Sequence, residues 1–382
     1  MIHAADRAGI AIVCKEEQGD FLERQFPVAP ACRRASSRGE EQAGNGLPPR
    51  IVSGGQQEKI SVAVVGVGYL GKFHTEKYAS LPDAELVAVV DIDEARACQV
   101  AKKFSCQPYF SHQDIIGRVE AVSVVTPTKE HYHIARDLLE AGIHVLVEKP
   151  MTVTLPEADI LIELARERDL TLQVGHLERF NPAVVTAREH VQQPLFVESH
   201  RLASFTERGT EVNVILDLMI HDIDIILSLL SSSLKDLHAV GVRVLTRHID
   251  IASVRLEFTD GCIANLTASR ISAKKMRKIR IFQPDSYISL DYAARKVELF
   301  RKLNQTGSDG LPEIEYQRLQ VADVDPLQEE LRAFLHSVRS GEPPVVSGKA
   351  GRDALELATL VSDEIQQRTK ELSRVLGLAG EG

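Results

Sequence analysis

The sequence predicts a two-part α/β fold, in which a doubly wound parallel sheet is followed by an α+β unit with a mostly antiparallel, open-faced sheet. The first observation is an apolar run that begins at Ile60 and leads into three spaced glycines and a helical pattern. The second is the alternation of strand-like and helical runs up to residue 174, which is typical of parallel strands joined by crossover helices. The third is the alternation of polar and apolar residues in the second half, which indicates antiparallel hairpins.

The glycines form the pattern Gly66-x-Gly68-x-x-Gly71, and the loop between them contains Tyr69 and Leu70. Gly66 would allow a tight turn, Gly68 would let the backbone approach a phosphate, and Gly71 would let the helix pack closely on the strand. The N-terminus of that helix would attract a pyrophosphate. The sequence therefore predicts an N-terminal Rossmann dinucleotide-binding domain, with this loop against the cofactor.

An acidic residue follows the next strand-like run, residues 84–90. Asp91 lies 20 residues beyond Gly71, where a carboxylate can accept hydrogen bonds from the ribose hydroxyls of a dinucleotide. A carboxylate there would also repel a 2′-phosphate. NAD is therefore the expected cofactor.

The composition excludes several other classes of protein. The chain has 382 residues, 44% of them hydrophobic, which is enough for two cores. Its net charge of −9 argues against a general surface for nucleic acids or anionic membranes. The five cysteines are an odd number without a Cys-x-x-Cys pair, so neither a disulfide framework nor a zinc site is expected. No apolar run reaches the roughly 18 residues of a membrane span, and we expect a cytoplasmic protein.

The chain divides into three predicted segments. Residues 1–58 include a polar, turn-rich stretch without apolar periodicity, so we expect a disordered extension. Residues 59–178 form the predicted Rossmann domain, and residues 179–376 form the predicted α+β domain for substrate binding and oligomerisation. Strands of this second domain are expected near 195–204, 237–246, 250–258, 261–270, 277–283, 286–292 and 294–301, with a final helix over 349–376.

Polar motifs follow three predicted parallel strands, at the edge where such sheets bind ligands. Thr126-Pro127-Thr128 follows strand 121–125, Glu148-Lys149-Pro150 follows strand 143–147, and His176 begins the segment after strand 170–174. The ammonium group of Lys149 could polarise a hydroxyl or ketone beside a nicotinamide. A lysine in such a loop is also often only solvated, and its position alone leaves both readings open.

His131 and His133 lie in a predicted helix over residues 130–141. Alternate residues of a helix point in different directions, so this pair is not expected to bind a metal. No metal site is predicted.

The nearly apolar segment 213–230 carries polar residues at helical spacing, namely Asp217, His221, Asp224 and Ser228. On a helix they would form one stripe. The stripe would either line a cleft or be a satisfied internal network, and the sequence leaves both open. Asp217 lies one turn before His221 and could orient the imidazole and raise its basicity, as a histidine general base requires.

On these motifs the chain resembles the glucose–fructose oxidoreductase/inositol dehydrogenase (Gfo/Idh/MocA) family of NAD(P)-dependent oxidoreductases, from about Lys59 to Leu376. The resemblance implies that Lys149, His221 and Asp217 are catalytic. It also implies cofactor contacts from Thr126, Pro127, Thr128, His131, Glu148 and Lys149, and a homodimer or homotetramer. Residues 1–58 have no counterpart in the family, which leaves open a true appendage or a start site placed too early.

A narrower resemblance is to the branch that oxidises the 3-hydroxyl of UDP-N-acetylglucosamine ahead of transamination in lipid A synthesis. It rests on residues 174–182 and 198–210. It implies a nucleotide-sugar substrate and functional coupling to a pyridoxal-phosphate (PLP) aminotransferase. The predicted substrate-binding residues are His176, Arg179, Asn181, Arg201 and Arg208, and further cations are Arg270, Lys274 and Lys275. Each cation could instead form a surface salt bridge.

The predicted function is NAD-dependent oxidation of a sugar hydroxyl to a ketone. His221 would take the hydroxyl proton, and Lys149 would stabilise the developing alkoxide. An inositol, other cyclitol or free-sugar dehydrogenase is an alternative with the same chemistry. A non-catalytic nucleotide-sensing protein of the same fold is a second alternative, against which the presence of Lys149 and the Asp217–His221 pair counts.

Overall fold

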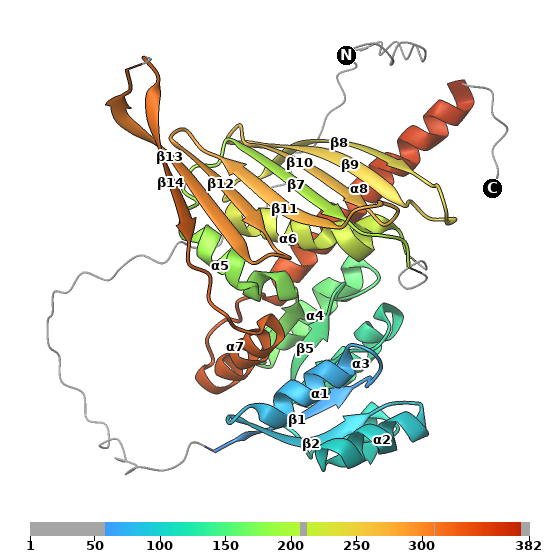
Figure 1. Cartoon of the computed structure of the whole chain (residues 1–382). Coiled ribbons are helices and arrows are strands. Elements are labelled where there is room, and N and C mark those ends of the chain that lie inside the picture. The colour runs from blue at the N-terminus through green and yellow to red at the C-terminus, as the bar shows by residue number, and fades with distance from the viewer. Residues whose placement is uncertain (1–57, 207–211, 309, 376–382) are drawn as a thin grey trace, which may run out of the picture.

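The computed structural model describes residues 58–206, 212–308 and 310–375. Residues 1–57 of the predicted disordered extension lie outside the described residues. So does Arg208, which was assigned to substrate binding. Figure 1 shows two sheets, each packed against helices, which confirms the predicted fold class.

The first sheet has six parallel strands in the order β3-β2-β1-β4-β5-β6. The order reverses between β1 and β4, and open α/β sheets bind ligands in the crevice at such a reversal. All residues of β4 are buried, as expected for a parallel strand covered on both faces. The strands are β1 Ile60–Val65, β2 Ala84–Val90, β3 Gln107–Tyr109, β4 Ala121–Val124, β5 His144–Glu148 and β6 Leu172–Gly175.

Four helices connect these strands. Helix α3 confirms the helix predicted over 130–141 within two residues, and α1 confirms the helix predicted after the glycine loop. Helix α4 begins with a capping box, because the Thr154 hydroxyl accepts from Glu157 N and the Glu157 carboxylate accepts from Thr154 N. A short 3₁₀ turn covers His112–Ile115. The helices are α1 Gly71–Ser80, α2 Glu94–Phe104, α3 Thr128–Glu140 and α4 Leu155–Glu167.

The second sheet has eight strands in the order β14-β13-β12-β11-β7-β10-β9-β8. Neighbours are antiparallel except for β7 and β10, which are parallel. The strands predicted over 250–258 and 261–270 are β9 and β10, and they pair as an antiparallel hairpin. The strands are β7 Phe196–Leu202, β8 Leu234–Val242, β9 Ile251–Phe258, β10 Ile263–Ser269, β11 Met276–Phe282, β12 Ser286–Asp291, β13 Lys296–Thr306 and β14 Pro312–Leu319.

The edges of the second sheet depart from the prediction. Strand β14 was not predicted, and β13 continues five residues beyond the predicted end at 301. All of β14 except Leu319 is exposed, so the burial alternation that identifies a strand is missing there. Strand β8 also starts and ends earlier than predicted.

Helices cover one face of the second sheet, and the other face carries none in Figure 1. The covering layer is α5 Pro182–Arg188, a π-helical turn Ile215–Met219, α6 Ile220–Leu229 and α8 Gly348–Val375. Their apolar side chains share a core with the inward residues of the sheet. Over the part of the chain that the structure describes, no helix is at once long and apolar enough to cross a membrane.

Helix α7, Pro326–Ser340, returns to the first sheet. Leu331, Phe334 and Leu335 are buried in one core with Ile60 and Val62 of β1. This helix lies within the predicted second domain, 179–376, yet it completes the core of the first. The domain boundaries remain a prediction.

Candidate active site

The glycine loop has backbone conformations that require glycine at two of its three positions. Gly66 has a φ of +87°, and a Cβ there would lie 2.6 Å from the carbonyl oxygen of Val125. A Cβ on Gly71 would lie 1.8 Å from the carbonyl oxygen of Gly66. A Cβ on Gly68 would meet no atom of the described residues within 4 Å, so the backbone there faces open space that a phosphate could fill. Within the part of the chain that the structure describes, no side chain caps helix α1, and the N-terminus of this helix is therefore suited to face an anion.

Asp91 lies directly after β2, beside this loop. Its carboxylate accepts hydrogen bonds from the backbone N–H groups of Val67 and Asp93, both at 2.9 Å. Arg96 Nη1 lies 3.2 Å from both carboxylate oxygens. The backbone contacts fix the acid at the strand end, where the ribose of a bound dinucleotide would lie.

The loop after β4 begins helix α3 and is tied to the loop after β5. The ring nitrogens of His131 lie 2.8 Å from the Thr126 carbonyl oxygen and 2.9 Å from that of Pro150. His131 therefore joins the two loops and does not offer a free ring nitrogen to a ligand. The Thr126 hydroxyl, in contrast, is buried without a hydrogen-bond partner in the described chain, and a bound cofactor could supply one.

Lys149 connects the end of β5 to the π-helical turn of the second domain. Its Nζ donates a hydrogen bond to the backbone carbonyl oxygen of Asp217 at 2.7 Å. The peptide bond between Lys149 and Pro150 is cis. The ammonium group is thus held beside the segment that contains His221.

The structure does not reproduce the single polar stripe that the sequence suggested for residues 217–228. Residues 215–219 are π-helical and α6 begins only at Ile220, which changes the angular spacing between Asp217 and His221. Nδ1 of His221 is buried without a hydrogen-bond partner in the described ranges, and the Asp217 carboxylate lies 3.9 Å from Arg270 Nη2. Asp224 and Ser228 have separate partners.

The His221 imidazole lies in a positive environment. Burial, together with the charges of Lys149, Arg201, His176 and Arg277, holds its pKa well below the usual 6.5. This direction is opposite to the rise expected from Asp217. The ring is therefore uncharged at neutral pH and can accept a proton.

Burial lowers the pKa of His176, which lies among the charges of Asp224, Arg179, Lys149 and Glu148. Both of its ring nitrogens are buried without a hydrogen-bond partner among residues that the structure describes. Buried polar atoms are rarely left unpaired. The imidazole is therefore suited to contact a ligand.

The arginines assigned to the substrate are engaged in internal ion pairs. Arg179 forms a bidentate pair with Asp224 at 2.6 and 2.8 Å. Arg201, only 3% exposed, forms one with Asp222 at 2.8 and 3.0 Å and also contacts Glu178.

Two further candidates also have structural partners. Arg270 donates to the Val212 carbonyl oxygen. Asn181 caps α5 and contacts Glu178. Lys274 and Lys275 are exposed.

Several residues that lie at or near the site were not assigned to it from the sequence. Arg277 on β11 is exposed and its charge reaches His221, and its signal was the basic run 274–278. Arg96 pairs with Asp91. His74 and Glu330 lie buried next to Glu148, and no local pattern in the sequence connects residues so far apart.

The glycine loop, the acid after β2 and the paired loops after β4 and β5 define the class as a dinucleotide-binding oxidoreductase. A model of the oxidoreductase family with an NAD-binding Rossmann fold matches residues 60–176, and a model of the GFO/IDH/MocA C-terminal domain matches residues 183–285. The chain therefore belongs to the Gfo/Idh/MocA family, which confirms the resemblance.

Comparison with individual proteins supports the same family. UDP-N-acetylglucosamine 3-dehydrogenase from Acidithiobacillus ferrooxidans is 38% identical over 79% of this chain and 96% of its own length. A solved structure of that enzyme superposes with a TM-score of 0.76, at 35% identity, over 81% of this chain and 98% of the other. Myo-inositol 2-dehydrogenase from Thermotoga maritima is 26% identical over 83% of this chain and 100% of its own length.

Proposed function

We propose that this enzyme oxidises the 3-hydroxyl of UDP-N-acetylglucosamine with NAD, ahead of a transamination that serves lipid A synthesis. The observation that carries the proposal is the 38% identity to a UDP-N-acetylglucosamine 3-dehydrogenase across 96% of that protein. Three free cysteines among the described residues, Cys98, Cys106 and Cys262, agree with a reducing cytoplasm as the compartment.

The described residues fit a dinucleotide. The open space at Gly68, the uncapped N-terminus of α1 and the unpaired Thr126 hydroxyl are suited to its phosphates and polar groups. NAD, when bound, supplies the hydride acceptor. The protein must supply the proton acceptor and the stabilisation of charge.

His221 is the proposed proton acceptor, because its imidazole is uncharged at neutral pH and carries an unpaired buried nitrogen. Lys149 is the proposed cation that stabilises the substrate oxygen as its proton leaves. Asp217 contributes its backbone carbonyl to Lys149. For Asp217 to orient His221 as predicted, the Asp217 carboxylate would have to move when the substrate binds.

The substrate pyrophosphate needs cations that are not already paired inside the protein. Arg179 and Arg201 are paired with buried acids, so we assign their charges first to the framework of the site. The exposed basic run Lys274, Lys275 and Arg277 is the better candidate for phosphate contacts.

A coupled assay tests the proposal. Oxidation of a ring hydroxyl by NAD is generally uphill near neutral pH, so we expect little NADH from UDP-N-acetylglucosamine alone. Addition of a pyridoxal-phosphate aminotransferase and glutamate, which remove the ketone, should increase NADH several-fold. The same assay with His221→Ala serves as the control.

Two results would replace the proposal. If the coupled assay stays flat while myo-inositol or a free hexose yields steady NADH, the enzyme is a cyclitol or sugar dehydrogenase. If no polyol or sugar nucleotide yields NADH, the nucleotide-sensing alternative is favoured.

Asp91 is expected to make NAD strongly preferred over NADP, because its carboxylate would repel the 2′-phosphate. Asp91→Ser should relax this preference, since it removes one of the two acids that pair with Arg96 and so frees part of the guanidinium charge to attract that phosphate, although Asp93 still contacts Arg96. Titration of NAD and of NADP into the unaltered enzyme and into the Asp91→Ser variant measures the preference. Asp83→Ser, at a partly exposed acid of the same domain, is the control, and equal affinity of the unaltered enzyme for both cofactors would contradict the prediction.

We also propose that a second copy of the chain covers the open face of the second sheet, as in a homodimer or homotetramer. A row of aromatic rings crosses five strands of this face, with neighbouring centroids 4.8–5.6 Å apart. Phe282 and Tyr316 are exposed and the other three rings are half-buried, and apolar surface of this kind commonly marks interfaces. The row is Phe196, Phe282, Tyr287, Phe300 and Tyr316, and a monomeric mass in light scattering would count against the proposal.

A further inference from the structure

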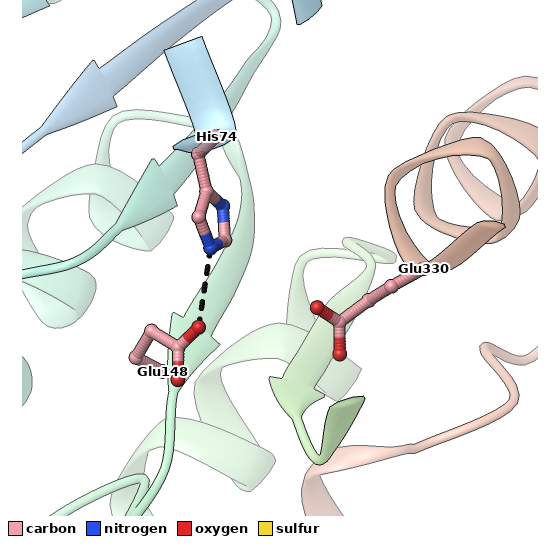
Figure 2. Close-up of side chains that lie close together, drawn as sticks. All are labelled: His74, Glu148 and Glu330. Carbon is pink, nitrogen blue, oxygen red and sulfur yellow. Dashed lines mark hydrogen bonds and ion pairs between the residues drawn. The ribbon is translucent and has the colours of Figure 1, made fainter. Parts of the chain in front are cut away.

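A group of three ionisable side chains, two buried and one half-buried, lies behind the Glu148–Lys149 turn, and the proposed mechanism does not use it. His74 comes from α1, Glu148 from the end of β5 and Glu330 from α7 (Figure 2). His74 Nε2 lies 3.1 Å from Glu148 Oε1. The Glu330 carboxyl group points toward this pair, and the three ligand atoms all lie within 4.8 Å of one another.

The two carboxyl groups differ in what surrounds them. Glu148 contacts His74 and also accepts a hydrogen bond from its neighbour, Lys149 N, at 3.2 Å. Glu330 is 0% exposed, and neither of its carboxyl oxygens has a hydrogen-bond partner in the described chain. A carboxylate buried without donors and beside a second carboxylate is strongly disfavoured.

A single metal ion does not fit this group well. Among the described residues only these three side chains contribute ligand atoms, whereas a structural zinc ion takes about four ligands and a magnesium ion about six. A proton on one of the two carboxyl groups removes the repulsion between them without any movement of the side chains.

We propose that Glu330 is held as an uncharged carboxylic acid beneath the Glu148–Lys149 turn, and that this keeps Lys149 in position for the reaction. Glu330 is then a positioning residue that acts through Glu148. The link to Lys149 rests on the proposed function, whereas the protonation of Glu330 does not.

The surrounding charges agree with this assignment. Burial, then the negative charges of Glu148 and Asp224, raise the pKa of Glu330 well above its usual 4.5. Burial alone would raise the pKa of Glu148 too, but the hydrogen bond and charge of His74 and the charge of Lys149 lower it overall. The charge of Glu330 also acts on Tyr78 of α1. Two carboxyl groups whose pKa values are pushed apart share one proton in this way.

The turn has little room to yield if Glu330 becomes charged. A Cβ on Gly175 would lie 3.0–3.1 Å from the Glu148 side chain and Cα, so Glu148 is confined on the side of β6. Lys149 is fixed at its far end by the Asp217 carbonyl. Repulsion between two charged carboxylates would therefore displace the turn that carries Lys149.

The stability of the protein should depend on pH in a defined direction. Below about pH 4.5 both the folded and the unfolded chain hold the Glu330 proton. As the pH rises above that value the unfolded chain releases it while the folded chain keeps it, so Glu330 lowers stability increasingly until the raised folded pKa is reached.

Glu330→Gln, which mimics the protonated acid, tests the proposal. Its melting temperature should exceed that of the unaltered enzyme by a margin that grows from about pH 5 to about pH 9. Its kcat should match at neutral pH, and its loss of activity at alkaline pH should shift to higher pH. A carboxylic-acid C=O band should appear in the infrared difference spectrum between the two proteins. Glu329→Gln, at a partly exposed neighbour, is the matched control and should change none of these.

The outcomes are separable. The melting and infrared measurements need no substrate, so they remain valid if the proposed activity is wrong. Equal pH dependence of both proteins, or a stoichiometric metal that elemental analysis detects and Glu330→Gln loses, would overturn the proposal. Glu330→Met is a second uncharged variant, and failure of both variants to fold or to turn over would also overturn it.

Discussion

Lys149→Met and His221→Ala are each expected to lower kcat by on the order of 10²- to 10⁴-fold while NAD affinity stays within a few-fold. Neither side chain lies on the glycine loop, so cofactor binding should persist. Lys129→Met and His336→Ala, at exposed positions, are the matched controls and should retain full turnover. Steady-state kinetics and NAD titration measure both effects.

The acid side of the pH profile is a separate test of His221. Because its pKa lies well below 6.5, the imidazole stays uncharged in weakly acidic solution, and kcat/KM should remain flat through pH 6.5. Asp217→Asn should cost far less than His221→Ala, since it preserves the backbone carbonyl that accepts from Lys149. Near-normal turnover in either the Lys149 or the His221 variant would show that the residue is structural.

Arg201→Met is expected to lower the free energy of unfolding by about 3–5 kcal/mol, because it leaves Asp222 buried without its partner. Arg166→Met removes a guanidinium from an exposed pair with Glu163 and should change stability by less than about 1 kcal/mol. Urea unfolding monitored by circular dichroism measures both. The double replacement Arg201→Met/Asp222→Leu should recover much of the loss.

This experiment also decides between two roles for Arg201. If Arg201→Met unfolds at the same urea concentration as the unaltered enzyme but raises KM for the sugar nucleotide, the arginine binds the substrate, as the sequence suggested. A large loss of stability with an unchanged KM would assign it to the framework of the site.

Features of the fold that arise from local sequence patterns could be predicted. The alternation of apolar runs predicted the first sheet, and Gly66, Gly71 and Asp91 occupy the turn and strand end that their spacing indicated. Each of these depends on local geometry, which a short stretch of sequence specifies.

Features that depend on distant partners could not be predicted in the same way. The π-helical turn at 215–219 altered the spacing that placed Asp217 against His221. The acids that pair with Arg179 and Arg201 lie more than 20 residues away along the chain. Strand β14 has no buried face to reveal it. In each case the local structure depends on which parts of the folded chain come into contact. The periodicity of apolar residues along the sequence carries no information about those contacts.

The return of helix α7 to the first sheet has a consequence for folding during synthesis on the ribosome. The ribosome completes the last strand of that sheet at Gly175, but Leu331, Phe334 and Leu335, which close the core over β1, follow much later. At synthesis rates of about 5–20 residues per second, the apolar surface of β1 would wait roughly 8–30 seconds after Gly175 for its cover. During that interval the nascent N-terminal half is a natural client for chaperones, and a fragment that stops after Gly175 should aggregate when expressed alone.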